Sequence, residues 1–267
     1  MDLGVRGRAY VIVGGTAGIG FAAARALAED GADVAVVGRD RERAANAADA
    51  LRGMGDGTIV ALAGDMGTDD DATRVIGEAI GALGGLAGVA VTTGTSGAAH
   101  STLEDADDTV WDESFDDTLM TVVRPVRAAL PHLVARGDGS IVTTAAYSIH
   151  APHANRMPYV ALKSAVATFT KNVARSYGAS GVRANCVCPG AIETGGLAAL
   201  RKMLAEQQGV PEEGVLERVM VEEWHMDVAL GRPGRPEEVG DLFAFLLSPR
   251  SGYTTGALVN VDGGTDF

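Results

Sequence analysis

Short apolar runs alternate with longer amphipathic stretches from one end of the chain to the other. Several runs, such as Val34–Val37, are apolar throughout, which is typical of strands that are covered on both faces. Such alternation of strands and helices predicts a parallel sheet with helices on both sides. We therefore expect a doubly wound α/β fold with a seven-stranded parallel sheet. The predicted strands are Ala9–Val13, Asp33–Val37, Thr58–Leu62, Gly88–Thr92, Ser140–Thr144, Val182–Val187 and Ala257–Val261, and the predicted helices are Ile19–Asp30, Arg41–Arg52, Asp69–Leu83, Trp111–Arg136, Pro158–Gly178 and Pro236–Leu247.

The segment Ala191–Gly231 interrupts this alternation, because it contains two helix-like stretches and no strand. A long excursion between a strand and the next helix is often a lid over a binding site, and a plain packing excursion is the alternative. We expect one domain, residues 1–267, with a helical substrate flap at about residues 191–231.

Charge and composition restrict the partners that this chain can have. The formal net charge of −13 disfavours nucleic acid and anionic membrane surfaces, both of which attract basic proteins. Residues 1–8 are too short and polar for a signal peptide, and no stretch approaches the roughly 20 apolar residues of a membrane span. Cys186 and Cys188 lie two apart without clustered histidines, which favours reduced core residues over a metal or redox site. We expect no metal, no nucleic-acid or membrane partner, and a cytoplasmic location.

A glycine-rich turn lies between the first predicted strand and the first predicted helix. Glycines at this place allow a tight turn and let backbone N–H groups approach a pyrophosphate at the helix N-terminus. The spacing is Gly-x3-Gly-x-Gly, so the position of the turn carries more weight than its pattern. We expect a dinucleotide to be bound by Gly14, Thr16, Ala17, Gly18, Ile19 and Gly20.

The residues after the second strand indicate which dinucleotide is bound. An NAD enzyme usually has an acid there for the ribose 2′-hydroxyl, whereas this chain has Gly38-Arg39-Asp40. Glycine leaves room for a 2′-phosphate, and the Arg39 guanidinium can grip it with several N–H donors. Asp40 could still take the acid's place, and Arg39 could simply be solvated. The pattern favours NADP(H), with NAD as the alternative.

Tyr159 and Lys163 are four residues apart, which places them on one face of a helix. A cation beside a phenol favours the phenolate and is expected to lower the pKa of Tyr159. Such a phenol can exchange a proton with a substrate near neutral pH. A surface pair is the alternative, and the pattern favours a catalytic pair.

The chain resembles the short-chain dehydrogenase/reductase family across nearly its whole length, through six motifs in the same order and spacing. This resemblance implies a Rossmann-type fold, a nicotinamide cofactor, and a Tyr159 that gives the alcohol oxygen its proton while hydride leaves the cofactor. It also implies that Asp65 and Met66 border the adenine, that Lys163 holds the nicotinamide ribose, and that Pro189, Gly190, Ile192 and Thr194 line the nicotinamide. The matching motifs are Gly14-Gly15-Thr16-Ala17-Gly18-Ile19-Gly20, Gly64-Asp65, Tyr159-x3-Lys163, Asn185-x3-Pro189-Gly190 with Thr194, Gly231-Arg-Pro-Gly-Arg-Pro-Glu-Glu-Val239 and Val261-Asp262-Gly263-Gly264.

Three positions depart from the family pattern. The family's Asn-Asn-Ala-Gly after the fourth strand is replaced by Thr92-Thr93-Gly94-Thr95, of which we expect Thr93 and Gly94 to bind cofactor. The usual asparagine after Trp111 is Thr118, and the serine expected thirteen residues before the tyrosine is Ala146. If the fifth strand continues, Ser148 lies on the face of Ala146 and can orient a carbonyl oxygen, with Thr144 as the alternative.

These observations predict an NADP(H)-dependent oxidoreductase that interconverts a ketone and a secondary alcohol, with Tyr159, Lys163 and Ser148 as its catalytic residues. The expected partner is a small carbonyl or alcohol substrate held under the flap. A non-catalytic NADP-binding sensor or structural protein is one alternative, and a dehydratase or epimerase on the same site is another. The resemblance further implies a homo-oligomer, either a tetramer or a dimer, paired through the helices Trp111–Arg136 and Pro158–Gly178 and around the C-terminal strand.

Overall fold

A single parallel sheet forms the centre of the structure, a computed structural model that describes residues 2–94, 101–152, 155–224 and 226–265. Within these residues the sheet has seven strands in the order β3-β2-β1-β4-β5-β6-β7, and every neighbouring pair is parallel. The predicted doubly wound α/β fold is confirmed. The strands are β1 (Ala9–Val13), β2 (Asp33–Gly38), β3 (Ile59–Ala63), β4 (Gly88–Val91), β5 (Ser140–Thr144), β6 (Arg183–Pro189) and β7 (Leu258–Val261).

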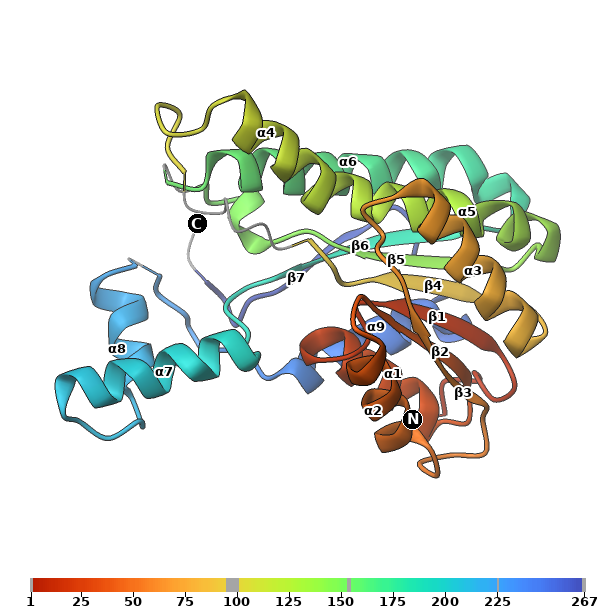
Figure 1. Cartoon of the computed structure of the whole chain (residues 1–267), viewed down its shortest axis with the longest axis horizontal. Helices are drawn as coiled ribbons and strands as arrows, with labels where there is room; N and C mark the ends of the chain where they lie inside the picture. The colour runs from red at the N-terminus through yellow and green to blue at the C-terminus, as the bar shows by residue number, and fades with distance from the viewer. Residues whose placement is uncertain (1, 95–100, 153–154, 225, 266–267) are drawn as a thin grey trace.

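Helices cover both faces of the sheet (Figure 1). One face carries α1 (Gly18–Glu29), α2 (Arg41–Leu51) and α9 (Pro236–Leu247), and the other carries α3 (Asp69–Leu83), α5 (Thr121–Arg136) and α6 (Met157–Tyr177). The strand order reverses between β1 and β4, so the crevice at their carboxyl ends is where this class of fold binds its ligands.

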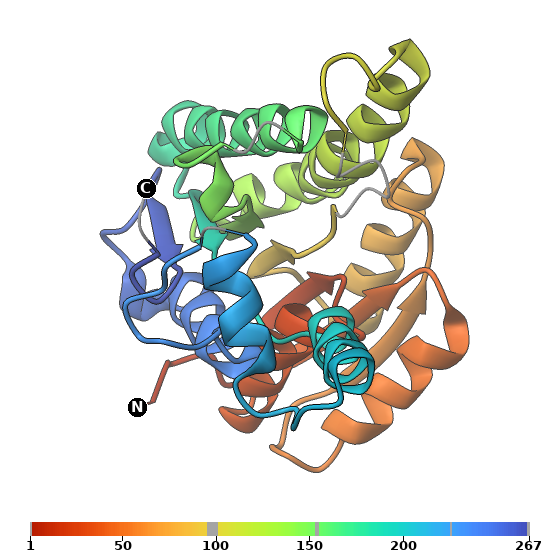
Figure 2. The same cartoon turned by 90° about the vertical axis from the view of Figure 1, so that its left-hand side faces the viewer.

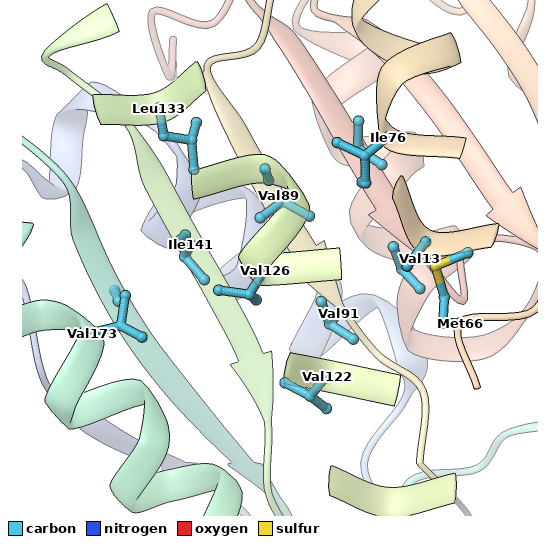
Figure 3. Packing of buried hydrophobic residues seen from close by; sticks show 14 of the residues in the cluster. Val13, Met66, Ile76, Val89, Val91, Val122, Val126, Leu133, Ile141 and Val173 are labelled. Atoms are coloured by element: carbon cyan, nitrogen blue, oxygen red, sulfur yellow. The ribbon is translucent and has the colours of Figure 1, made fainter. Parts of the chain in front are cut away.

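The strands divide their side chains between two hydrophobic cores, as the period of two along a strand requires. Val89 and Val91 of β4 and Ile141 of β5 pack against Val126 and Leu133 of α5 (Figure 3). The alternate residues of the same strands face the core shared with α1 and α9. Burial on both faces fixes the sheet, so the strand ends hold the site residues on a rigid base.

The long helix predicted over Trp111–Arg136 is interrupted. The structure has α4 (Asp108–Ser114), the π-helical segment η2 (Phe115–Met120) and then α5. A π-helical turn contains an extra residue, which changes the direction of the following side chains. Here the turn contains Thr118, whose side chain is fully buried.

The fifth strand does not continue as far as Ser148, so the expectation of an extended strand there is wrong. β5 ends at Thr144, and Tyr147–Ile149 form the 3₁₀ turn η3, in which the His150 N–H donates to the Tyr147 carbonyl oxygen at 2.9 Å. The ladder to β6 continues for one more bond, from the Ala145 N–H to the Val187 carbonyl oxygen at 2.8 Å. Ser148 is still buried, although by a turn and not by strand alternation.

Residues 191–231 contain α7 (Gly195–Gln208) and α8 (Val215–Glu222), and no strand among the residues of this segment that the structure describes. The two helices lie beyond the sheet on the side where β6 ends, as the turned view in Figure 2 shows. Leu216, Met220, Met226 and Val228 form a separate small core there, together with Tyr147 of η3. The segment therefore has its own packing, joined to the main body through the residues after β5.

Cys186 and Cys188 are free thiols, fully buried on β6, as expected. In the described ranges no helix is long and apolar enough to cross a bilayer. The same ranges contain no group of three or more His, Cys, Asp or Glu side chains that could hold a metal ion. A cytoplasmic location stays a prediction.

Candidate active site

A cavity of about 600 Å³ opens at the carboxyl ends of β1 to β4, at the point where the strand order reverses. Seven of the residues predicted to bind cofactor line it: Gly14, Thr16, Arg39, Asp65, Met66, Thr93 and Gly94. The other described lining residues are Val13, Val37, Gly38, Asp40, Arg43, Gly64, Asp117 and Thr121. The cavity has the place and the size expected of a dinucleotide site.

The glycine turn needs its glycines for close packing. Gly14 has φ of +80°, and a Cβ on it would lie 2.6 Å from the Thr92 hydroxyl oxygen. A Cβ on Gly20 would collide with the Gly14 carbonyl oxygen, so α1 can approach the turn only without that atom. Thr92 fixes the turn from the side of β4, because its hydroxyl donates to the Val13 carbonyl oxygen at 3.0 Å. The backbone at the start of α1 thus stays open to a phosphate group.

The end of β2 presents two guanidinium groups to the cavity, those of Arg39 and Arg43. Asp40 also lines the cavity, and its Oδ1 caps α2 by accepting the Arg43 backbone N–H at 2.8 Å. A Cβ on Gly38 would lie 2.5 Å from the Thr16 methyl group. Gly38 is therefore explained by the packing of Thr16, and the room it leaves for a ligand is an additional effect. Arg43 was not among the predicted site residues, although its place four residues after Arg39 is a signal for it.

Asp117 and Thr121 also line the cavity, and sequence reasoning missed both. They lie in η2 and at the start of α5. The Thr121 hydroxyl donates to the Asp117 carbonyl oxygen at 2.7 Å, which stabilises the junction of the two segments. No sequence signal marks these residues, because the π-helical turn decides which side chains face the cavity.

Tyr159 and Lys163 come from the first turns of α6 and are brought together, with the Lys163 Nζ 5.7 Å from the centre of the Tyr159 ring. The Lys163 ammonium donates to the carbonyl oxygens of Thr144 at 3.0 Å and Thr93 at 3.5 Å. A Cβ on Gly94 would lie 3.1 Å from the Lys163 Nζ. Lys163 thus lies against Thr93 and Gly94 of the cavity and links Tyr159 to it.

Burial controls the protonation of this pair. It lowers the pKa of Lys163 to about 8, since no carboxylate compensates the buried ammonium. Burial also raises the pKa of Tyr159, and the nearby Arg156 opposes that shift without overcoming it. The expected lowering of the Tyr159 pKa is therefore wrong, because removal of the phenol from water outweighs the effect of the cations.

The hydroxyl groups predicted to orient a carbonyl oxygen differ in their partners. Thr144 donates its hydroxyl proton to the Val91 carbonyl oxygen at 2.8 Å. The hydroxyl groups of Ser148, Thr118 and Thr93 are buried and have no hydrogen-bond partner among the described residues. A buried hydroxyl without a partner is costly, which is typical of a group that serves a ligand. These three groups are therefore available to bind one.

Pro189 ends β6, and the loop that follows contains Gly190, Ile192 and Thr194, but none of these four predicted cofactor residues is among the described residues that line the cavity. The Gly190 N–H donates to the Val261 carbonyl oxygen at 3.0 Å, and Ile192 forms an isolated bridge with Gly234, so Pro189 and its neighbours are tied to β7 and the segment before α9. Thr194 precedes α7 and approaches the glycine turn, since a Cβ on Gly18 would lie 3.0 Å from its methyl group. Ala17 is the residue before α1, and Ile19 lies in its first turn. These roles stay predictions.

Comparison with known proteins gives consistent matches along the chain. The family model described as Enoyl-(Acyl carrier protein) reductase matches residues 14–266. Dehydrogenase/reductase SDR family member 4 of Bos taurus is 30% identical over 258 residues, which cover 96% of this chain and 86% of that relative. Cis-4-hydroxycyclohexanecarboxylate dehydrogenase of Sinomonas cyclohexanicum is 33% identical over 261 residues, which cover 96% of each chain. The solved structure of L-sorbose reductase from Gluconobacter frateurii, complexed with NADPH and L-sorbose, is similar with a TM-score of 0.90 and 30% identity, over 99% of this chain and 98% of that one.

The matched region begins in the glycine turn and extends beyond β7, so it includes every described cavity residue except Val13, and it includes Tyr159 and Lys163. The relatives are dehydrogenases and reductases, and the family binds a nicotinamide cofactor. The protein is an oxidoreductase, and the chain belongs to the short-chain dehydrogenase/reductase family.

Proposed function

We propose that this protein interconverts a ketone and a secondary alcohol, with NADP(H) as the hydride carrier and Tyr159 as the proton donor or acceptor. The observation that carries the proposal is that Lys163, whose Nζ lies 5.7 Å from the centre of the Tyr159 ring, lies against Thr93 and Gly94 of the cavity. Arg39 and Arg43 line the same cavity. Two relatives support the kind of substrate, since one is named for a hydroxycyclohexanecarboxylate and the sorbose reductase structure contains L-sorbose.

The residues at the cavity fit NADP(H) better than NAD. Arg39 and Arg43 present two positive groups where a 2′-phosphate would lie, while the Asp40 carboxylate is used by the α2 cap. The L-sorbose reductase structure is similar in fold and is complexed with NADPH. Thr93, Gly94 and Lys163 would hold the nicotinamide ribose, because the lysine ammonium lies against the backbone of these two residues.

When bound, the nicotinamide would supply the hydride that the carbonyl carbon needs for reduction, and would accept a hydride from the alcohol carbon for oxidation. Tyr159 gives the proton of its hydroxyl group to the carbonyl oxygen, so the ketone becomes an alcohol. The raised pKa of Tyr159 keeps this proton on the phenol at neutral pH, which suits an acid. Lys163 stabilises the phenolate that remains, and bulk solvent restores its proton.

We further propose that Ser148 donates a hydrogen bond to the carbonyl oxygen in place of the serine that Ala146 replaces. The hydroxyl group of Ser148 is buried and unpartnered among the described residues, as a donor reserved for substrate would be. Residues 191–231 would act as a lid of the single domain, because α7 and α8 lie beyond the carboxyl end of β6 and pack on Tyr147. This apolar lid would exclude water from the reacting groups.

The proposal is tested by following NADPH oxidation with a panel of ketones. Tyr159→Phe should abolish turnover and leave NADPH binding within about twofold, because only the proton donor is removed. Arg39→Ala should weaken NADPH binding by about 1.5–3 kcal/mol and leave NADH binding nearly unchanged, since a charged hydrogen bond has this magnitude.

Comparable turnover in Tyr159→Phe would contradict its catalytic role. Equal losses for the two cofactors in Arg39→Ala would contradict the 2′-phosphate site. NADPH binding without turnover of any ketone would instead favour a non-catalytic NADP-binding protein or another reaction on the same site.

A further inference from the structure

Arg156 occupies the residue before α6, three positions ahead of Tyr159. Residues three apart on a helix are neighbours on one face, and they are separated by about 4.5 Å along the axis. Arg156 is partly buried, so its guanidinium group lies at the protein boundary next to the catalytic phenol. As the N-cap residue of α6, Arg156 keeps its backbone close to the first turn of the helix, which contains Tyr159.

Most arginines of this chain have a carboxylate partner, and Arg156 does not. Arg201 binds two carboxylates at 2.7 and 2.8 Å, and Arg232 binds Glu238 at 2.7 Å. Arg156 makes no ion pair or side-chain hydrogen bond with any described residue. The chain has 35 acidic residues against 22 basic ones. Arg183 is also partly buried without an acid, but it donates instead to the backbone carbonyl oxygens of residues 246–248, and Arg156 has no such acceptors among the described residues. A cation in that state is favourable when a ligand brings the missing charge.

The positive charge of Arg156 acts on two phenols that belong to different elements. It opposes the raised pKa of Tyr159 on α6 and that of Tyr147 in η3. No carboxylate contributes to the pKa of either phenol, so the cations that face this pair are Arg156 and, beside Tyr159, Lys163. Tyr147 in turn packs on Met220 and Met226 of the apolar cluster next to α8. Tyr147 thus contacts an apolar cluster and is also subject to the positive charge of Arg156.

We propose that Arg156 binds a carboxylate of the substrate, so that the ketone reduced here is an oxo acid and the alcohol a hydroxy acid. This proposal rests on the proposed ketone reductase function and specifies its substrate class. A planar guanidinium matches a carboxylate through two parallel hydrogen bonds. The single helical turn between Arg156 and Tyr159 places that carboxylate a few bonds from the ketone. Arg156 also supplies a local attraction for an anion that the net charge of −13 would otherwise repel.

The test uses matched pairs of acid and ester with NADPH: 3-oxobutanoate and 4-oxopentanoate, each beside its methyl ester. We expect the wild-type protein to prefer each acid at least tenfold in kcat/KM. Arg156→Gln should lower kcat/KM for the acids about ten- to a hundredfold, mainly through KM, and leave the esters within twofold. Arg156→Lys should keep part of the preference, because it keeps the charge and loses the planar fork. Arg175→Gln is the control, since it removes an exposed arginine from the far end of α6.

Two outcomes would overturn the carboxylate site while leaving the ketone reductase function in place. One is a preference for the esters, and the other is an equal loss for acids and esters in Arg156→Gln. Binding is measured separately, as the shift in thermal midpoint that each acid or ester gives with NADP bound. Acid binding that depends on Arg156, without turnover of any ketone, would support the site and contradict the reductase function. Acid binding that is unchanged in Arg156→Gln would overturn the site whether or not the protein is a reductase.

Discussion

At the scale of single residues, two hydroxyl groups after β5 differ in whether their proton is already engaged. Thr144 donates to the Val91 carbonyl oxygen, whereas the Ser148 hydroxyl has no partner among the described residues. A free hydroxyl can turn toward a substrate oxygen, while an engaged one must first give up a buried hydrogen bond. Ser148 is therefore the better candidate, although the strand geometry that first suggested it is wrong.

Ser148→Ala should lower kcat about tenfold to a hundredfold and change KM little, as steady-state kinetics with a ketone can measure. The carbonyl oxygen gains negative charge as hydride arrives, so a donor aimed at it helps mainly in the transition state. Thr144→Val is the matched comparison and should change kcat less, apart from any loss of stability. A Ser148→Ala variant within twofold of wild type, together with a crippled Thr144→Val, would assign the role to the threonine.

The buried lysine should lower the stability of the protein without cofactor. Its pKa is depressed from 10.5 to about 8, so below pH 8 folding must bury a charge that the unfolded chain keeps in water. Lys163→Met should raise the free energy of unfolding at pH 7 by up to roughly 3 kcal/mol, since each pKa unit corresponds to about 1.4 kcal/mol. The difference in unfolding free energy between the variant and the wild type should narrow as the pH rises from about 8 to 10.5. Above that range Lys163 is neutral in both the folded and the unfolded state.

Urea unfolding of both proteins at pH 7 and at about pH 9.5 measures this effect, and the variant should be inactive. Equal stabilities at pH 7 would show that the hydrogen bonds from Lys163 to Thr93 and Thr144 offset its burial.

At the scale of elements, the sequence predicted correctly those helices whose first and last residues are marked by capping residues or proline. α3 and α9 have the predicted bounds, because capping and proline residues mark them. A Thr68 side chain caps α3 and three aspartates occupy its first turn, while Pro236 opens α9. The π-helical segment η2 and the turn η3 were not predicted, since they depend on how Thr118 and Ser148 pack against the rest of the fold.

For the candidate site, too, the sequence predicted the residues that adjoin predicted strands and missed those that depend on packing. Gly14, Thr16 and Arg39 lie next to strand ends that the sequence predicts, so their convergence on one cavity follows from the parallel sheet. Asp117 and Thr121 reach the same cavity from a helix whose local period differs from 3.6 residues per turn. Arg156 has no motif at all, and its significance comes from the partners that it lacks.

Arg201 links the two helices of residues 191–231 to each other and to the loop after β6. Arg201 of α7 donates to Glu193 at 2.7 Å, next to Thr194, and to both carboxylate oxygens of Glu217 of α8 at 2.8 and 2.9 Å. Its side chain is 13% exposed, so these bonds are partly shielded from water. Without it, two carboxylates would face each other across the start of the segment.

Arg201→Gln should loosen residues 191–231 and raise KM for the ketone substrate severalfold, with little change in the midpoint of global thermal unfolding. Hydrogen exchange in α7 and α8 should increase, because the local bonds are lost while the main cores are untouched. Lys202→Gln is the control, since it alters an exposed lysine of α7 that takes no part in these bonds. Unchanged exchange in Arg201→Gln would contradict the anchoring role.

At the scale of the whole molecule, two of the surfaces with exposed apolar side chains bear on oligomer formation. Phe115 and Met157 are exposed on the η2–α6 side, and Leu258 is 42% exposed on β7. β7 is the edge strand of the sheet, which leaves one side of its backbone free for pairing. Both surfaces agree with the regions through which the family resemblance implies oligomer contacts.

We expect a homotetramer in solution, which light scattering at micromolar concentration can measure. Leu258→Asp should reduce the particle to a dimer, because it places a charge in the contact around β7. Val221→Asp changes an exposed apolar residue of α8 outside both surfaces and should leave the mass unchanged. A stable monomer of the wild-type protein would contradict the expectation.

The separate core of α7 and α8 has a consequence for how proteins of this architecture diversify. Because Leu216, Met220 and Val228 pack with each other and with Tyr147, and not within the two main cores, changes among them leave the sheet and its cofactor cavity intact. Descendants of one ancestor can therefore alter the compounds they accept while keeping the same redox machinery. Replacing residues 191–231 with the corresponding segment of a relative should therefore give the protein the substrate range of that relative.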